Sequence, residues 1–343
     1  MIDQTHVETQ LEGVITEELA GMRLDQALAS LFPDYSRSRL QTWTREGRVR
    51  VNDEQRRPRD KVSLGDRLRL TAVVEPQVAC VAQDIPLHIL FEDDDLLIIN
   101  KPAGLVVHPA AGNRDGTLQN GLLHHAPALA DLPRAGIVHR LDKDTTGLMV
   151  VARSQAAHKR LVDAIAAREV HREYRALVVG NMPAGGTIDV PIGRHPTNRI
   201  RMAVNPLGKP SVTHFRVLGH FRGHTLLKVI LDTGRTHQIR VHMAHLRHPV
   251  FGDQTYGRRL QLPAGASDSL KAVLRGFRRQ ALHAKRLDFI HPVAKRPMRF
   301  TCPLPDDMRQ VIDAFAMDAD QHWQEAEVDD YVGFIDLDQH DPV

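Results

Sequence analysis

The stretch that decides the fold is Gly136-Ile-Val-His-Arg-Leu-Asp-Lys-Asp-Thr-Thr-Gly147. It opens with the apolar pair Ile137 and Val138, continues through a dense polar cluster, and leads into a second apolar run at residues 148–152. Short apolar runs bounded by glycine are typical of buried strands. The pattern therefore predicts a tight connection between two core strands that places one carboxylate, Asp142, between cations. Loops supported by a rigid scaffold in this way often carry function.

The composition indicates a globular protein with neither a membrane helix nor a disulfide framework. The length of 343 residues suggests about two domains. No apolar run approaches the roughly 18 residues that a membrane helix needs, and the polar residues 1–10 lack the apolar segment of a signal peptide. The two cysteines, Cys80 and Cys302, are too few for a disulfide framework or a cysteine-rich zinc site. We expect a cytoplasmic protein.

The charge is unevenly distributed along the chain. The net charge is +3, but residues 317–343 contain nine acidic residues and no lysine or arginine, so residues 1–316 carry +12. An acidic tail on a basic body is typical of nucleic-acid-binding proteins, although a solvated basic surface without a partner gives the same count. We expect the acidic tail to be disordered.

The pattern divides the chain into a leader (1–14), a small basic module (15–75), a linker (76–86), a large α/β region (87–316) and the acidic tail (317–343). Within the small module, apolar residues recur first at helical spacing and then alternate as in a strand. The first helix face carries Leu24, Ala27, Leu28 and Leu31, the second carries Leu40 and Trp43 after a cap at Ser36, and the strand carries Val49 and Val51.

Arginines are packed into this module more densely than solubility requires, although a solvated charged face is the alternative. The module resembles an S4 RNA-binding domain, a small αL-like fold, in Arg23-Leu24-Asp25, Ser36-Arg37-Ser38-Arg39-Leu40 and Gly47-Arg48-Val49. This resemblance implies binding of structured RNA through shape and backbone, with arginines on phosphates. The residues that we expect to contact RNA are Arg23, Arg37, Arg39 and Arg48.

The large region alternates predicted strands with few helices. Strands are expected at residues 96–100, 174–179, 213–218 and 225–231, and helices are expected after caps at Ser154, Thr236 and Asp306. Successive strands without an intervening helix favour an α+β fold with a mixed, largely antiparallel sheet over a doubly wound sheet. Because no Gly-x-Gly-x-x-Gly or P-loop pattern is present, no nucleotide cofactor is expected.

Over residues 15–315 the chain resembles the RluA-type pseudouridine synthases, and with its S4 module it resembles the D group of that family. The resemblance implies the family's mixed-sheet catalytic domain, no cofactor and no metal. It also implies isomerisation of uridine to pseudouridine in large-subunit (23S) ribosomal RNA, at the helix 69 loop. The motifs that carry it are Asn100-Lys101-Pro102-Ala103-Gly104 through His108, the loop from His139 to Gly147, Arg172-Glu173-Tyr174, and Thr233-Gly-Arg-Thr-His-Gln-Ile-Arg-Val-His242.

The resemblance also implies a role for individual residues. The reaction breaks the N1–C1′ bond of uridine and re-forms the link through C5, so charge develops on the sugar as in glycoside hydrolysis. Asp142 is then the catalytic carboxylate, either as nucleophile at C1′ or as base at C2′. Arg140 would fill the position that the flipped nucleotide vacates, Tyr174 would stack on the extruded uracil, and Arg240 would pair with Asp142. Structural salt bridges and a core aromatic are the alternatives.

Other interpretations stay open at this stage. Asp144 could form an acid–base dyad with Asp142, although a role in ordering the turn fits it better. His242 and His245 lie one helical turn apart, but no third ligand completes a metal site on that face. A transfer-RNA pseudouridine synthase and a non-catalytic RNA-binding or ribosome-assembly factor are the alternative functions. We expect a monomer whose partner is ribosomal RNA or the large ribosomal subunit.

Overall fold

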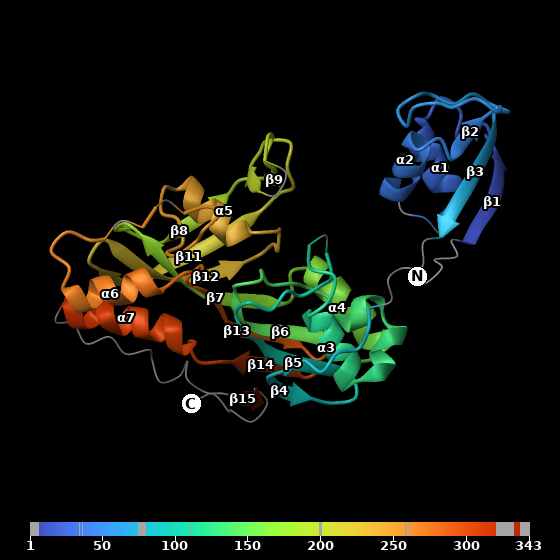
Figure 1. The fold of residues 1–343 in the computed structure, drawn as a ribbon. Helices are drawn as coiled ribbons and strands as arrows, with labels where there is room; N and C mark the ends of the chain where they lie inside the picture. The colour runs from blue at the N-terminus through green and yellow to red at the C-terminus, as the bar shows by residue number, and fades with distance from the viewer. Residues whose placement is uncertain are drawn as a thin grey trace, which may run out of the picture. The chain divides into compact units, whose positions relative to one another are not determined.

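The computed structural model describes residues 7–33, 35, 37–74, 80–110, 112–198, 201–257, 259–260, 262–319 and 333–336. The chain forms two compact units, Met1–Ala79 and Cys80–Val343, each with its own sheet (Figure 1). Among the described residues, no helix is long and apolar enough to cross a membrane.

The first unit combines a three-stranded antiparallel sheet with two helices. Strand β3 (Arg67–Val74) lies between β1 (Val7–Val14) and β2 (Val49–Val51). The apolar faces of α1 (Leu24–Leu31) and α2 (Arg37–Arg45) share one core with this sheet, as their helical spacing predicted. The expected cap of α2, Ser36, lies outside the described residues.

Strand β1 occupies residues that the sequence pattern assigned to a leader. It pairs with β3 along its whole length, with Leu11 opposite Leu70, and it lies at the edge of the sheet. Four of its eight residues are polar or charged and a fifth is glycine, so it shows no continuous apolar signal. An edge strand with one solvated face needs few apolar residues, which is why pattern alone missed it. Residues 1–6 lie outside the described part of the chain.

The second unit is built on a ten-stranded sheet in the order β4-β5-β6-β13-β7-β12-β11-β8, with β14 beside β13 and β15 beside β14. The pairing of β6 with β13 is parallel, and the other described pairs of this sheet are antiparallel. This confirms the predicted mixed, largely antiparallel α+β fold. The strands are β4 (Ile89–Glu92), β5 (Leu96–Lys101), β6 (Thr146–Ala152), β7 (His171–Val179), β8 (Gly186–Asp189), β11 (Val212–Phe221), β12 (His224–Leu231), β13 (Leu282–Ile290), β14 (Pro297–Thr301) and β15 (Gly333–Asp336).

The other elements of this unit surround the sheet. A separate two-stranded pair is formed by β9 (Ile192–Arg194) and β10 (Met202–Val204). The helices are α3 (Leu118–His125), α4 (Gln155–Ala166), α5 (Gln238–His245), α6 (Asp268–Gly276) and α7 (Asp306–Asp318), with 3₁₀ turns at Pro127–Asp131 and Pro133–Gly136.

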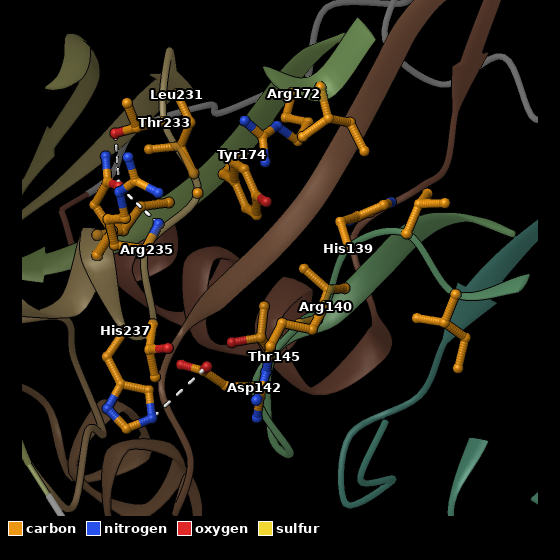
Figure 2. A pocket seen from close by; sticks show the side chains of 18 of the residues that line it. His139, Arg140, Asp142, Thr145, Arg172, Tyr174, Leu231, Thr233, Arg235 and His237 are labelled. Atoms are coloured by element: carbon orange, nitrogen blue, oxygen red, sulfur yellow. Dashed lines mark hydrogen bonds and ion pairs between the residues drawn. The ribbon is translucent and has the colours of Figure 1, made fainter. Parts of the chain in front are cut away.

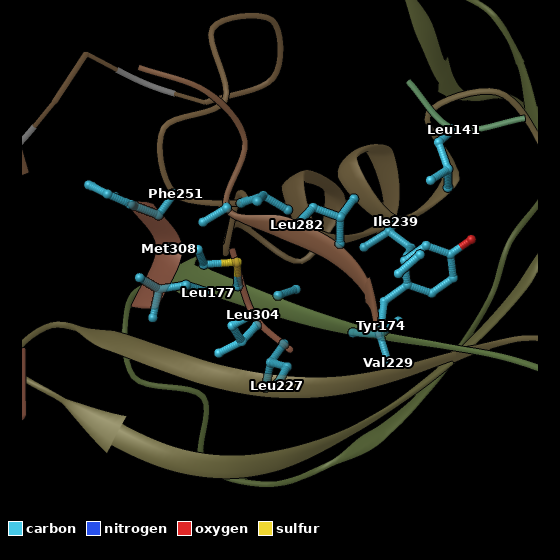
Figure 3. Packing of buried hydrophobic residues seen from close by; sticks show 14 of the residues in the cluster. Leu141, Tyr174, Leu177, Leu227, Val229, Ile239, Phe251, Leu282, Leu304 and Met308 are labelled. Atoms are coloured by element: carbon cyan, nitrogen blue, oxygen red, sulfur yellow. The ribbon is translucent and has the colours of Figure 1, made fainter. Parts of the chain in front are cut away.

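Both faces of the central strands are buried. In β5, Leu97 and Ile99 belong to one apolar core while Leu96 and Ile98 belong to another, because successive side chains of a strand point to opposite faces. The first core extends along β7, β12 and β13 to the base of Tyr174 (Figure 3). A continuous apolar strand is therefore the expected signature, and it is the one seen in residues 96–99.

Several local predictions need correction. Ile137 and Val138 do not form a strand; within the described residues Ile137 makes one isolated bridge, to Val151. Helix α5 has His237 rather than Thr236 at its N-cap, and α7 has Pro305 rather than Asp306. The cap at Ser154 is confirmed, since its hydroxyl accepts a hydrogen bond from the Ala157 amide.

The predicted linker and tail contain ordered segments. Asn120 of α3 donates to the Val81 carbonyl at 2.8 Å and accepts from the Gln83 amide at 3.1 Å, so this end of the expected linker is attached to the second unit. Helix α7 runs into the tail to Asp318, and β15 pairs with β14. The prediction of disorder for residues 320–332 and 337–343 lies outside the described residues.

Candidate active site

The four polar clusters of the second unit meet at one pocket of about 760 Å³ (Figure 2). The loop before β6 contributes residues 137–142, β7 contributes Arg172 and Tyr174, and the segment from β12 into α5 contributes residues 231–240. The remaining cluster contributes His108 and Pro109. Residues that are about 100 positions apart in sequence thus line a single cavity.

Asp142 lies on the wall of this pocket and faces two side chains of the α5 segment. Its Oδ2 accepts a hydrogen bond from Arg240 Nη1 at 2.8 Å, and its Oδ1 lies 3.8 Å from His237 Nε2. The side chain is 15 % exposed, so one face of the carboxylate remains open to the pocket. Asp142 is therefore ion-paired from one side and accessible to a ligand from the other.

The backbone around Asp142 is fixed by close packing of β6 against β13. Gly147 has φ +110°, and a Cβ atom at this position would lie 2.2 Å from the Ala284 carbonyl oxygen. Only glycine permits this approach. In the turn itself, the Thr145 amide donates to the Asp142 carbonyl at 3.1 Å, and Gln280 donates to the Thr145 hydroxyl at 3.1 Å. The glycine that ends the quoted stretch thus positions the loop.

Arg240 is held by a second carboxylate that the sequence did not single out. Its Nε and Nη2 donate to the two oxygens of Asp253 at 2.7 and 2.9 Å, while Nη1 points to Asp142. Burial lowers the pKa of Arg240, but the hydrogen bonds to Asp253 and the charges of Asp142 and Asp253 outweigh burial and raise it. Burial likewise raises the pKa of Asp253, and Arg240 more than offsets that effect. Asp253 and Arg240 are both charged.

Lys101 fixes the far side of the loop that carries Asp142. Its fully buried Nζ donates to the carbonyls of Pro102, Leu105 and Lys143 at 2.7, 3.0 and 2.9 Å. Burial lowers its pKa to about 8, although the carboxylates of Asp144 and Asp142 oppose the shift. The Asn-Lys-Pro motif therefore links the end of β5 to the residue that follows Asp142.

Tyr174 presents its ring to the pocket from β7 (Figure 2) and lies beside Ile239 in the apolar core (Figure 3). Burial raises the pKa of its hydroxyl, and the charge of Asp142 adds to this while Arg172 opposes it. The phenol is accordingly neutral. A flat, neutral ring at the wall of a polar cavity is suited to stacking on a base.

Arg140 and Asp144 occupy different environments from Asp142. Arg140 is exposed at the pocket, and among the described residues its guanidinium has no hydrogen-bond or ion-pair partner. Asp144 does not line the pocket; its carbonyl accepts from Arg279 Nη1 at 3.2 Å. The geometry thus separates the two carboxylates of the loop, and only Asp142 lines the cavity.

The histidines near the pocket have partners within the protein. Nε2 of His139 accepts from the Val150 amide, and burial, reinforced by Arg172, lowers its pKa to about 3, so the ring is neutral. The ring of His242 contacts the Thr213 hydroxyl and the Val190 carbonyl. Within the described ranges, no three histidine, cysteine or carboxylate side chains stand close enough together to hold a metal ion.

The predicted RNA-contacting arginines of the first unit lie on or near its two helices. Asp25, whose side chain is fully buried, pairs with Arg37 at 2.8 Å and with Arg23 at 3.1 Å. Arg39 lies over the Trp43 ring, with 5.5 Å between its guanidinium carbon and the ring centroid, and Arg48 pairs with Glu46 at 3.3 Å. Arg23 and Arg37 therefore also stabilise the fold, while both remain about half exposed.

Comparison with known proteins agrees with both units. Residues 95–245 match the family model described as RNA pseudouridylate synthase, and residues 22–68 match the S4 domain. A Yersinia pestis protein named ribosomal large subunit pseudouridine synthase D is 55% identical over 92% of this chain and 97% of its own length. The protein of the same name from Escherichia coli K12 is 53% identical over 93% of this chain and 98% of its own length. The solved structure of human RNA pseudouridylate synthase domain containing 4 has 26% identity and a TM-score of 0.52, covering 66% of this chain and 92% of that one.

The fold and the site thus define an RNA-modifying isomerase, and the chain belongs to the RNA pseudouridine synthase family. Within that family it is of the D type, with an N-terminal S4 domain.

Proposed function

We propose that this pseudouridine synthase acts on uridines of large-subunit (23S) ribosomal RNA, at the helix 69 loop, with Asp142 as its catalytic carboxylate. The observation that carries the assignment of Asp142 is its ion pair with Arg240 on the wall of the pocket, with one face left open. An aspartate that is paired with an arginine and also faces a cavity is placed to act on a substrate bound there. The cytoplasm, where ribosomal RNA is made and modified, is the proposed location.

The chemistry needs one carboxylate and a site from which water is largely excluded. Asp142 either attacks C1′ as the N1–C1′ bond breaks or removes the proton from C2′. Arg240 stabilises the carboxylate as an anion in both cases, because it is itself fixed by Asp253. The apolar side chains of Leu231, Ile239 and Leu282 line the pocket beside Tyr174 and limit the access of water to the sugar.

The target nucleotide must leave its stack before it reaches Asp142. Extrusion costs a few kcal/mol, and less in a loop than in a duplex. Stacking on Tyr174 returns about 1–3 kcal/mol. We assign to the unpaired, exposed Arg140 the position that the nucleotide vacates. The low cost of flipping in a loop supports a loop rather than a duplex as the target.

The S4 unit supports an RNA substrate that extends beyond the modified nucleotide. Its exposed arginines are suited to phosphate contacts, which position an RNA without reading its sequence. The names of the relatives support large-subunit ribosomal RNA over transfer RNA. The same names, together with a complete Asp142, Tyr174 and Arg240 set, disfavour a purely RNA-binding factor.

The test is a map of pseudouridines in ribosomal RNA from cells that lack the gene and from cells that carry the wild-type or the Asp142→Ala gene. We expect modification at a few large-subunit positions to disappear without the gene and to return only with the wild type. An unchanged set of pseudouridines in ribosomal RNA, together with the loss of pseudouridines from transfer RNA, would overturn the proposed substrate.

A further inference from the structure

Arg172 is a buried cation of the active-site pocket to which the described residues offer no hydrogen-bond or ion-pair partner. The residue is 7 % exposed and lines the cavity from β7, two positions before Tyr174 (Figure 2). In the described part of the chain its guanidinium forms no hydrogen bond and no ion pair, and its Nε is fully buried without a partner. Leaving a buried donor unpaired is unfavourable, and more so for a charged group. An unpaired buried cation in a functional site indicates a missing ligand.

The surroundings of Arg172 do not compensate its charge. Glu173 is engaged elsewhere, by Arg175 and by Lys228 at 2.8 Å. The neighbouring rings of His139 and Tyr174 are neutral, because burial lowers the pKa of the first and raises the pKa of the second. The pocket therefore contains a positive charge that no described carboxylate pairs with.

The protein also makes room for this guanidinium. A Cβ atom at Gly234 would lie 2.5 Å from Arg172 Nη1, so the glycine of the Thr-Gly-Arg motif allows the backbone to approach the arginine closely. On β7, Arg172 and Tyr174 point to the same face, since side chains alternate along a strand. The guanidinium of Arg172 therefore lies beside the Tyr174 ring, on which the base is proposed to stack.

The ligand that fits this position is the base itself. When the N1–C1′ bond breaks, its electron pair goes to uracil, whose N1, O2 and O4 share the negative charge. We propose that Arg172 holds the detached uracil as this anion, donating hydrogen bonds to its oxygen edge while the ring turns from N1 to C5. This role rests on the proposed chemistry, and it is the same whether Asp142 attacks C1′ or removes the C2′ proton.

The proposed step balances without an additional reactant. After the ring turns, C5 forms the new bond to C1′. At the same stage the bond from Asp142 to C1′ breaks, or the C2′ proton returns from Asp142. The C5 proton then leaves and N1 takes up a proton, so the product is an isomer of the substrate. Arg172 remains charged throughout and transfers no proton.

The experiment uses RNA with ¹⁴C-labelled uracil at the target site and three variants of the full chain. Arg172→Gln removes the charge, Arg172→Lys restores it, and Arg275→Gln makes the same charge change on α6, at an exposed position that does not line the pocket. We measure the single-turnover rate at saturating RNA, the RNA dissociation constant, and free uracil released with an abasic product.

We expect Arg172→Gln to lower the single-turnover rate about 100-fold, the usual loss for one donor to a developing anion. The dissociation constant should change less than twofold, and free uracil should appear. Arg172→Lys should recover part of the rate, and Arg275→Gln should match the wild type. Gly234→Ala, which displaces Nη1 without changing charge, should reproduce the rate loss if Arg172→Gln fails to fold.

Two results would overturn the role. A tenfold weaker RNA affinity with an unchanged saturated rate would make Arg172 a phosphate contact. Equal rate losses in Arg172→Gln and Arg172→Lys without free uracil would make it structural. A wild-type protein that forms no pseudouridine in ribosomal RNA would instead contradict the proposed substrate, so the two failures are distinguishable.

Discussion

Asp253 holds Arg240 by two parallel hydrogen bonds, 2.7 Å to Nε and 2.9 Å to Nη2, and so aims the third nitrogen of the guanidinium at the carboxylate of Asp142. Both partners are almost completely buried. A two-point ion pair fixes the plane of a guanidinium, which a single contact does not. The orientation of Arg240 is therefore determined by a residue that does not line the pocket.

This arrangement predicts that Asp253→Asn lowers activity without changing a residue that touches RNA. An amide offers one acceptor in place of two, so Arg240 loses its fixed orientation. We expect kcat to fall about 10- to 100-fold, the usual range for a residue that orients a functional group, with KM nearly unchanged. Asp288→Asn is the control, because Asp288 pairs with Arg286 and Arg299 on the sheet and does not line the pocket. A similar loss in both variants would count against a specific role for Asp253.

Because of Lys101, the free energy of unfolding of the second unit should change with pH in the alkaline range. Its pKa of about 8 lies below the ordinary 10.5 because burial disfavours the charged amine. Between these values the unfolded chain binds more protons at this group, so its contribution to the free energy of unfolding rises with pH. Denaturant titrations at pH 7.5 and 10.5 should show the wild type gaining up to about 3 kcal/mol over Lys101→Met.

The exposed Lys143 in the same loop supplies a control for this measurement. Lys143→Met should show the same pH dependence as the wild type. If the difference in free energy of unfolding between the wild type and Lys101→Met stayed constant across this range, the pKa of Lys101 would not be lowered in the folded protein.

Tyr174 should matter as a flat ring more than as core volume. Tyr174→Leu keeps an apolar side chain against Ile239 but removes the stacking surface. The loss of about 1–3 kcal/mol of stacking corresponds to a fall of about 5- to 150-fold in kcat/KM. Thermal unfolding should change little by comparison. A variant with full activity would place the extruded base elsewhere in the pocket.

The S4 unit should make RNA binding depend steeply on salt. Each arginine on a phosphate contributes about 0.7–0.9 to the slope of log affinity against log salt. Arg39→Gln and Arg48→Gln should each weaken binding at low salt and reduce the slope by about that amount. Filter binding between 50 and 300 mM salt measures both quantities. Unchanged slopes would make these two residues structural, through Trp43 and Glu46 respectively.

The parts of the fold that follow from local pattern were predictable. The apolar residues of helix α1 recur at helical spacing, and β5 and β6 are short continuous apolar runs. All three elements can therefore be recognised directly in the sequence. Strand β1 was missed because a half-solvated edge strand takes its order from its partner β3. The start of α5 was misplaced by one residue because His237 adopts a left-handed conformation, with φ +58°, at its N-cap.

The site residues that could be predicted from the sequence are those that lie in a distinctive motif. Asp142, Tyr174 and Arg240 lie in distinctive segments, and the structure brings all three to one pocket. Asp253 stands alone after Gly252, and nothing local shows that its partner is thirteen residues away on a helix. The role of Lys101 was likewise hidden, because its three acceptors are backbone carbonyls, one of them 42 residues distant.

The most direct test of the account is Asp142→Asn in the purified protein, assayed on large-subunit RNA labelled with tritium at C5 of uridine. Forming the C5–C1′ bond expels the C5 proton, so tritium released to water counts pseudouridine formed. We predict no detectable release and an RNA dissociation constant within about threefold of the wild-type value, since the fold and the phosphate contacts remain. Tritium release near the wild-type rate would contradict the assignment of Asp142 as the catalytic carboxylate.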